Sequence, residues 1–123
     1  MFAQEYKDTV QAVTQAVAEI KKLAVVTEST GLVKALSAGK PALLVHPPAI
    51  EFQTPHIWFP EYMLLLVAPR SRSNLAAATE LAPVIEALAA NLPGGIERVR
   101  PYDYTIGDEG YIVPAYEITY TGE

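Results

Sequence analysis

The sequence lacks cysteine, which excludes disulfide bonds, thiolate metal sites and cysteine nucleophiles. It also lacks an excess of positive charge, since nine Lys and Arg residues stand against fourteen Asp and Glu residues for a net charge of −5. That balance argues against broad affinity for nucleic acid phosphates. No apolar run approaches the ~20 residues of a membrane-spanning helix, and no signal peptide is evident at the N-terminus. We therefore expect a soluble chain, made in the cytoplasm and not exported.

Sequence motifs for common chemistry are missing as well. Neither GxGxxG nor GxxxxGK[ST] occurs, and no G-x-S-x-G elbow is present. The histidines, His46 and His56, lie beside prolines, with no acidic triplet at ligand spacing. The sequence thus predicts no metal site, no cofactor and no enzymatic activity.

The most informative stretch spans residues 41–69, where two apolar runs flank a proline-rich connection. The first run, Ala42–Val45, ends at His46-Pro47-Pro48, whose prolines have no amide hydrogen to donate to a strand ladder. The second run, residues 62–68, carries no charge and no polar alternation. This pattern predicts a strand buried on both faces or a strand at the centre of a sheet.

The connection between these strands, residues 49–60, contains Pro55 and Pro60 with Trp58 and Phe59 between them. Proline restricts pairing to an edge or a bulge, so the connection is predicted to form a projecting hairpin arm whose aromatic residues contact a partner. The alternative is that residues 57–59 simply begin the second strand and bury their side chains.

Apolar periodicity predicts three helices. A first helix is predicted over residues 2–23, a second short one over 31–36 after a run of hydroxyl residues and before Gly39, and a third over 75–92 with a kink or break at Pro83. Residues 24–26 suit either a short strand or the end of the first helix. The helical stripe of the first comprises Tyr6, Val10, Val13, Val17, Ile20 and Ala24.

The C-terminal part reads as a hairpin of residues 96–105 and 111–120 around a glycine-flanked acidic loop. Pro114 suggests an edge strand or a strand beginning. The predicted fold is α+β in one domain, residues 1–123. It has a mixed or antiparallel sheet of about four strands, with the N-terminal helix and a second long helix packed on it.

Charged residues give further interface candidates beside Trp58 and Phe59. Arg70 and Arg72 precede a helix start, where they would hold an anion or lie in a solvated turn. Arg98 and Arg100 alternate on one strand face and would meet acidic groups across an interface or stay solvated. The loop with Asp108 and Glu109 matches no calcium-binding pattern and reads as a solvated turn.

A set of apolar motifs resembles one protein family over nearly the whole chain. The set comprises ALLVHPP at 42–48, the apolar strand 63–67 followed by a polar turn and an Ala- and Leu-rich helix, Arg100-Pro101, and PAYEI at 114–118. This order resembles the tail terminator proteins of long-tailed bacteriophages (siphoviruses), especially those infecting actinobacteria.

The resemblance implies a structural virion protein in the neck region. Its copies would form a hexameric ring that caps the head-proximal end of the tail tube, stops tube growth and joins the tube to the head connector. Its partners would be the tail tube protein and the head-closure protein, and DNA would pass through the lumen without specific binding. As a separate hypothesis from the negative charge of the chain, the acidic loop with Asp108 and Glu109 would face that lumen.

Two alternatives stay open. Another neck component, such as a head-closure or tail-completion protein, would share these features. A small ligand-binding domain or enzyme would instead use a pocket beside His46, His56 and Trp58.

Overall fold

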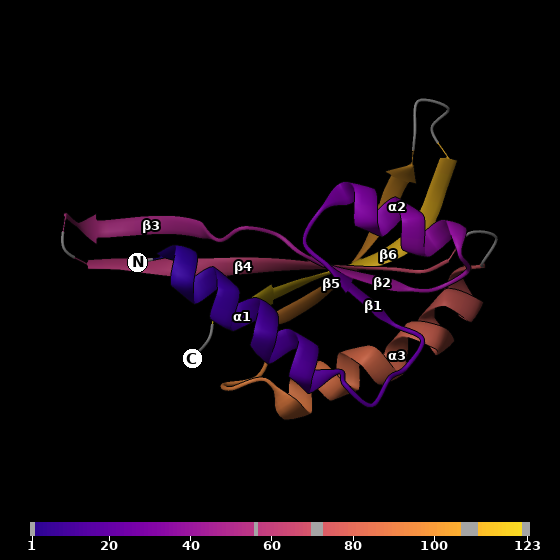
Figure 1. Cartoon of the computed structure of the whole chain (residues 1–123), viewed down its shortest axis with the longest axis horizontal. Helices are drawn as coiled ribbons and strands as arrows, with labels where there is room; N and C mark the ends of the chain where they lie inside the picture. The colour runs from indigo at the N-terminus through magenta and orange to yellow at the C-terminus, as the bar shows by residue number, and fades with distance from the viewer. Residues whose placement is uncertain (1, 56, 70–72, 107–110, 122–123) are drawn as a thin grey trace.

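Three helices and six strands occur in the described part of the chain. The computed structural model describes residues 2–55, 57–69, 73–106 and 111–121. In chain order the elements are α1 (Phe2–Ala16), β1 (Ala24–Val26), α2 (Ser29–Ser37), β2 (Ala42–Val45), β3 (Ala49–Thr54), β4 (Ile57–Val67), α3 (Asn74–Asn91), β5 (Arg98–Ile106) and β6 (Tyr111–Tyr120). Figure 1 shows their arrangement.

The strands form one mixed sheet in the order β1-β2-β4-β6-β5, and β3 also pairs with β4. The β1–β2 pair is parallel, whereas the other pairs are antiparallel. The predicted α+β class is confirmed, but the described sheet has six strands instead of about four. The two additional strands are β1, whose residues suit either a strand or the end of a helix, and β3, which lies in the predicted arm.

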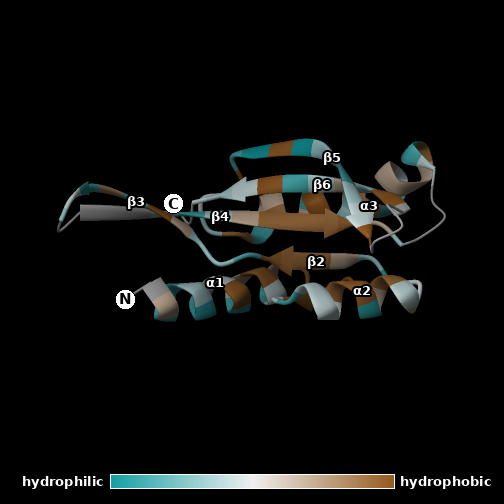
Figure 2. Ribbon diagram, turned by 90° about the horizontal axis from the view of Figure 1, so that it is seen from above, coloured by the Kyte–Doolittle hydropathy of each residue, from teal (hydrophilic) through white to brown (hydrophobic). Residues whose placement is uncertain are grey.

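Strand β4 occupies the centre of the sheet, between β2 and β6. Leu64 and Leu66 point into one apolar cluster, whereas Leu65 and Val67 point into another on the opposite face. All four are buried. Burial on both faces and a central position are therefore both confirmed for the half of β4 that pairs with β2 and β6, which is the brown part of β4 in Figure 2.

Helices cover both faces of the sheet. Helices α1 and α3 share one face, below the sheet in Figure 1, and α2 covers the other. The Asn91 Nδ2 atom at the end of α3 donates a hydrogen bond to the Ala16 carbonyl at the end of α1, at 3.0 Å. The buried helix residues are Val13 and Ala16 of α1, Leu32, Ala35 and Leu36 of α2, and Ala77, Leu81, Val84 and Leu88 of α3.

Helix α1 is shorter than predicted, because it ends at Ala16 and not near residue 23. The predicted apolar stripe extends beyond the end of α1 into a segment of turns. There, Ile20 N–H donates to the Val17 carbonyl at 3.0 Å, and Ile20 still packs on the core. The chain has to reverse here because β1 runs beside β2, where Ala24 N–H donates to the Pro41 carbonyl. Residues 24–26 are thus a strand.

Helix termini partly follow the predicted capping. Ser73 Oγ accepts a hydrogen bond from Ala76 N–H at 3.1 Å and caps α3, but Glu28 precedes α2 without any side-chain cap, so the hydroxyl cap expected there is wrong. Of the kink or break predicted at Pro83, the break does not occur, since α3 runs through this residue. Pro83 faces solvent while Leu81 and Val84 anchor the helix to the sheet.

Strand β6 is an interior strand, so the edge position suggested by Pro114 is wrong. The Pro114 carbonyl accepts from Ala68 N–H at 3.0 Å, which lies just past the end of β4. In an antiparallel strand the nitrogen and carbonyl of one residue face the same neighbour. The missing N–H therefore points past the end of β4 and removes no bond from the β5–β6 ladder.

Candidate assembly surfaces

Strands β2 and β3 lie in line along the same side of β4. The chain advances four residues from Val45 to Ala49, while their partners on β4, Leu64 and Glu61, are three residues apart. The extra residue falls in His46-Pro47-Pro48, so this segment acts as a bulge. Strand β2 ends at these prolines as predicted, but pairing with β4 resumes beyond them in β3.

Strand β3 and residues 57–61 of β4 form a two-stranded ribbon, called the arm below. Its strands run out side by side past the rest of the sheet in Figures 1 and 2, because β6 pairs with β4 only from Tyr62 onward. Every β3 side chain is exposed except Ile50, which is half-buried, and Phe52 is 61% exposed. The predicted projecting arm is present, and its exposure leaves strand edges available for pairing.

Trp58 and Phe59 lie in the arm at the start of β4, opposite Phe52 and Glu51. The alternative that residues 57–59 begin the second strand is thus confirmed for the backbone. The side chains of these residues lie outside the described part of the structure, so inward burial stays a prediction.

The far edge of the sheet is formed by β5, which pairs with β6 alone in the described part of the chain. Arg98 and Arg100 are exposed there, opposite Thr119 and Glu117. Neither arginine forms an ion pair with a residue that the structure describes. The alternation predicted for these arginines is confirmed, and their charges are available to a partner.

The other predicted charged candidates are not among the described residues. Arg70, Arg72, Asp108 and Glu109 lie outside the described residues, as does His56. The anion-binding turn and the lumen-facing acidic loop therefore remain predictions.

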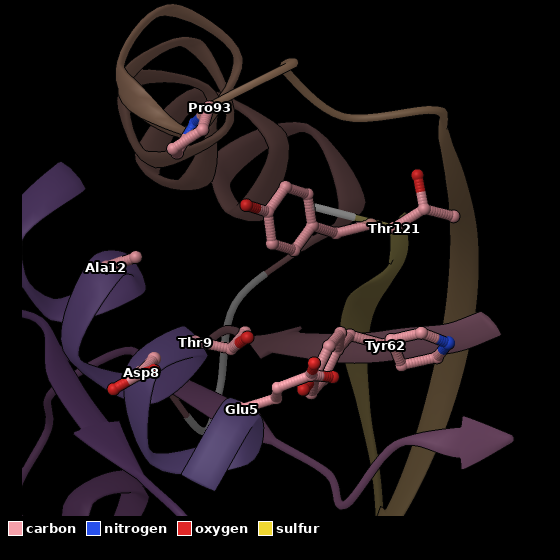
Figure 3. Close-up of a pocket in the computed structure, with 9 residues that line it drawn as sticks. Glu5, Asp8, Thr9, Ala12, Tyr62, Pro93 and Thr121 are labelled. Atoms are coloured by element: carbon pink, nitrogen blue, oxygen red, sulfur yellow. The ribbon is translucent and has the colours of Figure 1, made fainter. Parts of the chain in front are cut away.

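A pocket of about 340 Å³ lies at the base of the arm, between α1 and the sheet (Figure 3). Glu5, Asp8 and Thr9 approach it from α1, and Tyr62 faces them from β4. The remaining lining residues are Ala12, Pro60, Pro93, Tyr120 and Thr121. His46 does not line this pocket, so it is a different place from the histidine pocket of the ligand-binding alternative.

Three tyrosines from distant segments pack together beside this pocket. The ring centroids of Tyr6 and Tyr62 are 6.5 Å apart at an interplanar angle of 23°, and those of Tyr62 and Tyr120 are 6.3 Å apart. The Tyr6 hydroxyl donates to the Val45 carbonyl at 2.7 Å, which fastens α1 to β2. Tyr62 is only 2% exposed, and its hydroxyl has no hydrogen-bond partner among the described residues.

Burial raises the pKa of Tyr62 above its ordinary value of 10.0. The nearby Thr9 hydroxyl opposes this pKa shift without reaching hydrogen-bond geometry, and the negative charges of Glu5 and Asp8 add to it. The pKa values of Tyr6 and Tyr120 are raised as well, again chiefly by burial. All three hydroxyls are therefore protonated near neutral pH.

Removing the hydroxyls of Tyr62 and Tyr6 should have opposite effects on stability. Tyr62→Phe removes a buried group without a partner, so we expect the free energy of unfolding to stay equal or rise, by up to ~1 kcal/mol. Tyr6→Phe removes a bonded hydroxyl and should lower it by about 1 kcal/mol. Urea unfolding of both variants measures the difference, and equal losses would contradict this assignment.

The described residues contain neither a group of metal ligands nor a membrane-spanning helix. Within them, no three His, Asp or Glu side chains are placed to hold a metal ion together. None of the helices they form is both long and apolar enough to span a bilayer. Sequence reasoning found the arm and the β5 arginines but missed Glu51 and the tyrosine cluster, because only the strand register reveals their neighbours.

The sequence matches no protein-family model, and a search of curated proteins finds no match either.

Proposed function

We propose that this chain is a structural virion protein of a long-tailed bacteriophage, a tail terminator whose copies form a ring on the head-proximal end of the tail tube. One observation carries the proposal: in the described sheet, two unlike outer strands lie on opposite sides of β4, the arm strand β3 on one side and β5 on the other. The family resemblance of the sequence adds the viral context.

Two different edges favour a ring over a symmetric dimer. A contact between unlike surfaces of two copies is heterologous, and its repetition closes into a ring when the rotation fits. A hexamer is the ring size that the resemblance implies. Such a subunit would stop tube growth by occupying the tube tip and would offer its other side to the head connector.

The charge of the chain fits a ring around passing DNA. A net charge of −5 keeps phosphates from binding tightly, because nucleic acid affinity comes mainly from basic groups. The pocket of Figure 3 is compatible with a structural role, since none of its lining residues that the structure describes is a His, Lys or Arg that could work beside Glu5 and Asp8. A structural role is the better account of these features.

Electron microscopy of the purified chain with cognate tail tubes tests the proposal. We expect rings of one size at one end of each tube, and tubes that stop lengthening when the chain is added to polymerising tube protein. Binding to DNA-filled heads alone would identify a head-closure protein instead. A chain that binds neither tubes nor heads would overturn every virion role.

A further inference from the structure

We propose that the arm of one copy pairs with the β5 edge of the next copy, so that each sheet continues into that of its neighbour. This inference rests on the proposed ring and names the two surfaces that form it. The partner of the arm is a second copy of this chain. Strand direction, hydrogen-bonding groups and charge on the described residues each support it.

The strand directions are already correct for a continuous antiparallel sheet. Within one copy β3, β4, β6 and β5 alternate in direction, since each neighbouring pair is antiparallel. The β3 strand of a second copy added beside β5, with its sheet faces kept, runs antiparallel to β5. The same step repeats around a ring, whereas joining two arms or two β5 edges ends after one dimer.

The free backbone groups of both edges follow from the register. His46 N–H donates to the Met63 carbonyl, so odd-numbered β4 residues face the β2–β3 side and Ile50 and Phe52 direct their N–H groups outward from β3. By the same alternation, starting from the Ala68–Pro114 bond, Val99 and Asp103 direct theirs outward from β5. Pro101 lies between them and offers its carbonyl alone.

The side chains between these groups carry opposite charges. Glu51 lies between Ile50 and Phe52 on the arm and is exposed, and Arg98 and Arg100 flank Val99 and are exposed. Antiparallel addition of β3 to β5 places Glu51 on the same sheet face as the two arginines, because residues opposite each other share a face. Arg98 faces Thr119 within its own copy, so it has no opposite charge across the strand pair.

Charge also separates this pairing from its competitors. Two arms paired around Glu51 would bring two carboxylates together, and two β5 edges paired around Val99 would bring arginines together. Like charges opposite each other in a sheet are destabilising, and opposite charges are stabilising. The other outer strand, β1, has only three residues and offers a much shorter edge.

A mixing experiment with charge reversals tests the pairing. Glu51→Arg alone and Arg98→Glu alone each place like charges at every contact, so we expect ring formation to need about tenfold higher protein concentration or more. An equimolar mixture of the two variants should regain rings, because copies that alternate around an even-numbered ring restore opposite charges at every contact. Sedimentation velocity and electron microscopy measure both effects.

Two matched variants serve as controls. Glu86→Arg on α3 and Lys34→Glu on α2 make the same charge changes at exposed positions outside both edges, so rings should form as in the parent chain, alone and mixed. Circular dichroism checks that each variant is folded. A variant that failed because it was misfolded would not form rings on mixing either. Recovery in the mixture therefore excludes misfolding as the cause of the loss.

The outcomes separate this pairing from the proposed function. Rings that cap tubes and ignore both reversals, or variants that do not recover on mixing, overturn the pairing and leave the tail terminator proposal standing. Rings that respond as expected but bind no tube support the pairing and overturn the terminator role. A parent chain that stays monomeric with and without tubes overturns the pairing and the ring.

Discussion

A chain without its arm should fold and fail to form rings. Replacing residues 50–60 with Asn-Gly joins Ala49 to Glu61, which are paired residues in the parent, through a two-residue turn of the kind that closes antiparallel hairpins. The removed β3 side chains are mostly exposed, so the melting temperature should change by only a few degrees. Sedimentation velocity should then show monomers at every concentration at which the parent forms rings.

The point variant Phe52→Ser tests the same surface with less change. Phe52 is 61% exposed in the arm, so its loss should weaken ring formation without lowering stability. Leu75→Ser is the matched control, because Leu75 is 79% exposed at the start of α3, outside both edges. Rings of normal size from the chain without residues 50–60 would contradict the role given to the arm.

The largest loss of stability should come from truncating the central strand. Leu64 is fully buried in β4, in the cluster shared by α1, α3 and the sheet, so Leu64→Ala should cost about 3 kcal/mol through lost apolar contact and a cavity. For a domain of this size the melting temperature should fall by roughly 10 °C. Thermal and urea unfolding measure both values.

Leu75→Ala provides the comparison, because the same side-chain atoms are removed from a position 79% exposed. We expect a change within about 0.5 kcal/mol there. A similar loss at both positions would mean that Leu64 does not sit in the core described above.

Sequence reasoning identified the main strands because their signals are strong and local. The uncharged run at 62–68 has the composition of a strand covered on both faces, and β4 is covered on both faces there. The prolines before and within residues 49–60 indicated an arm, since proline is tolerated only at strand edges and bulges. These two features depend on residues near one another in the chain.

The remaining errors came from contacts between distant segments. Helical periodicity continued to residue 24, but the parallel pairing of β1 with β2 ends the helix earlier and turns the chain at Val17. Pro83 predicted a kink or a break, yet α3 continues through it, and its neighbours Leu81 and Val84 are buried against the sheet. Pairing partners far along the sequence decide such cases, and a single sequence does not show them.

The candidate assembly surfaces also contain some residues that local sequence patterns identify and others that only long-range contacts reveal. Arg98 and Arg100 were identified by alternation alone, whereas the importance of Glu51 depends on which groups of β3 face outward. The cluster of Tyr6, Tyr62 and Tyr120 joins one helix to two strands, so no short sequence pattern predicts it. Sequence supplied candidates, and register supplied their possible partners.

The position of the single tryptophan has a practical consequence for spectroscopy. Trp58 lies in the arm, opposite Phe52, while three of the seven tyrosines are packed within the body of the molecule. Selective excitation of indole fluorescence therefore follows events at the arm, and tyrosine absorbance follows melting of the interior. Emission that changes on dilution while tyrosine absorbance stays constant would report subunits separating as intact, folded molecules.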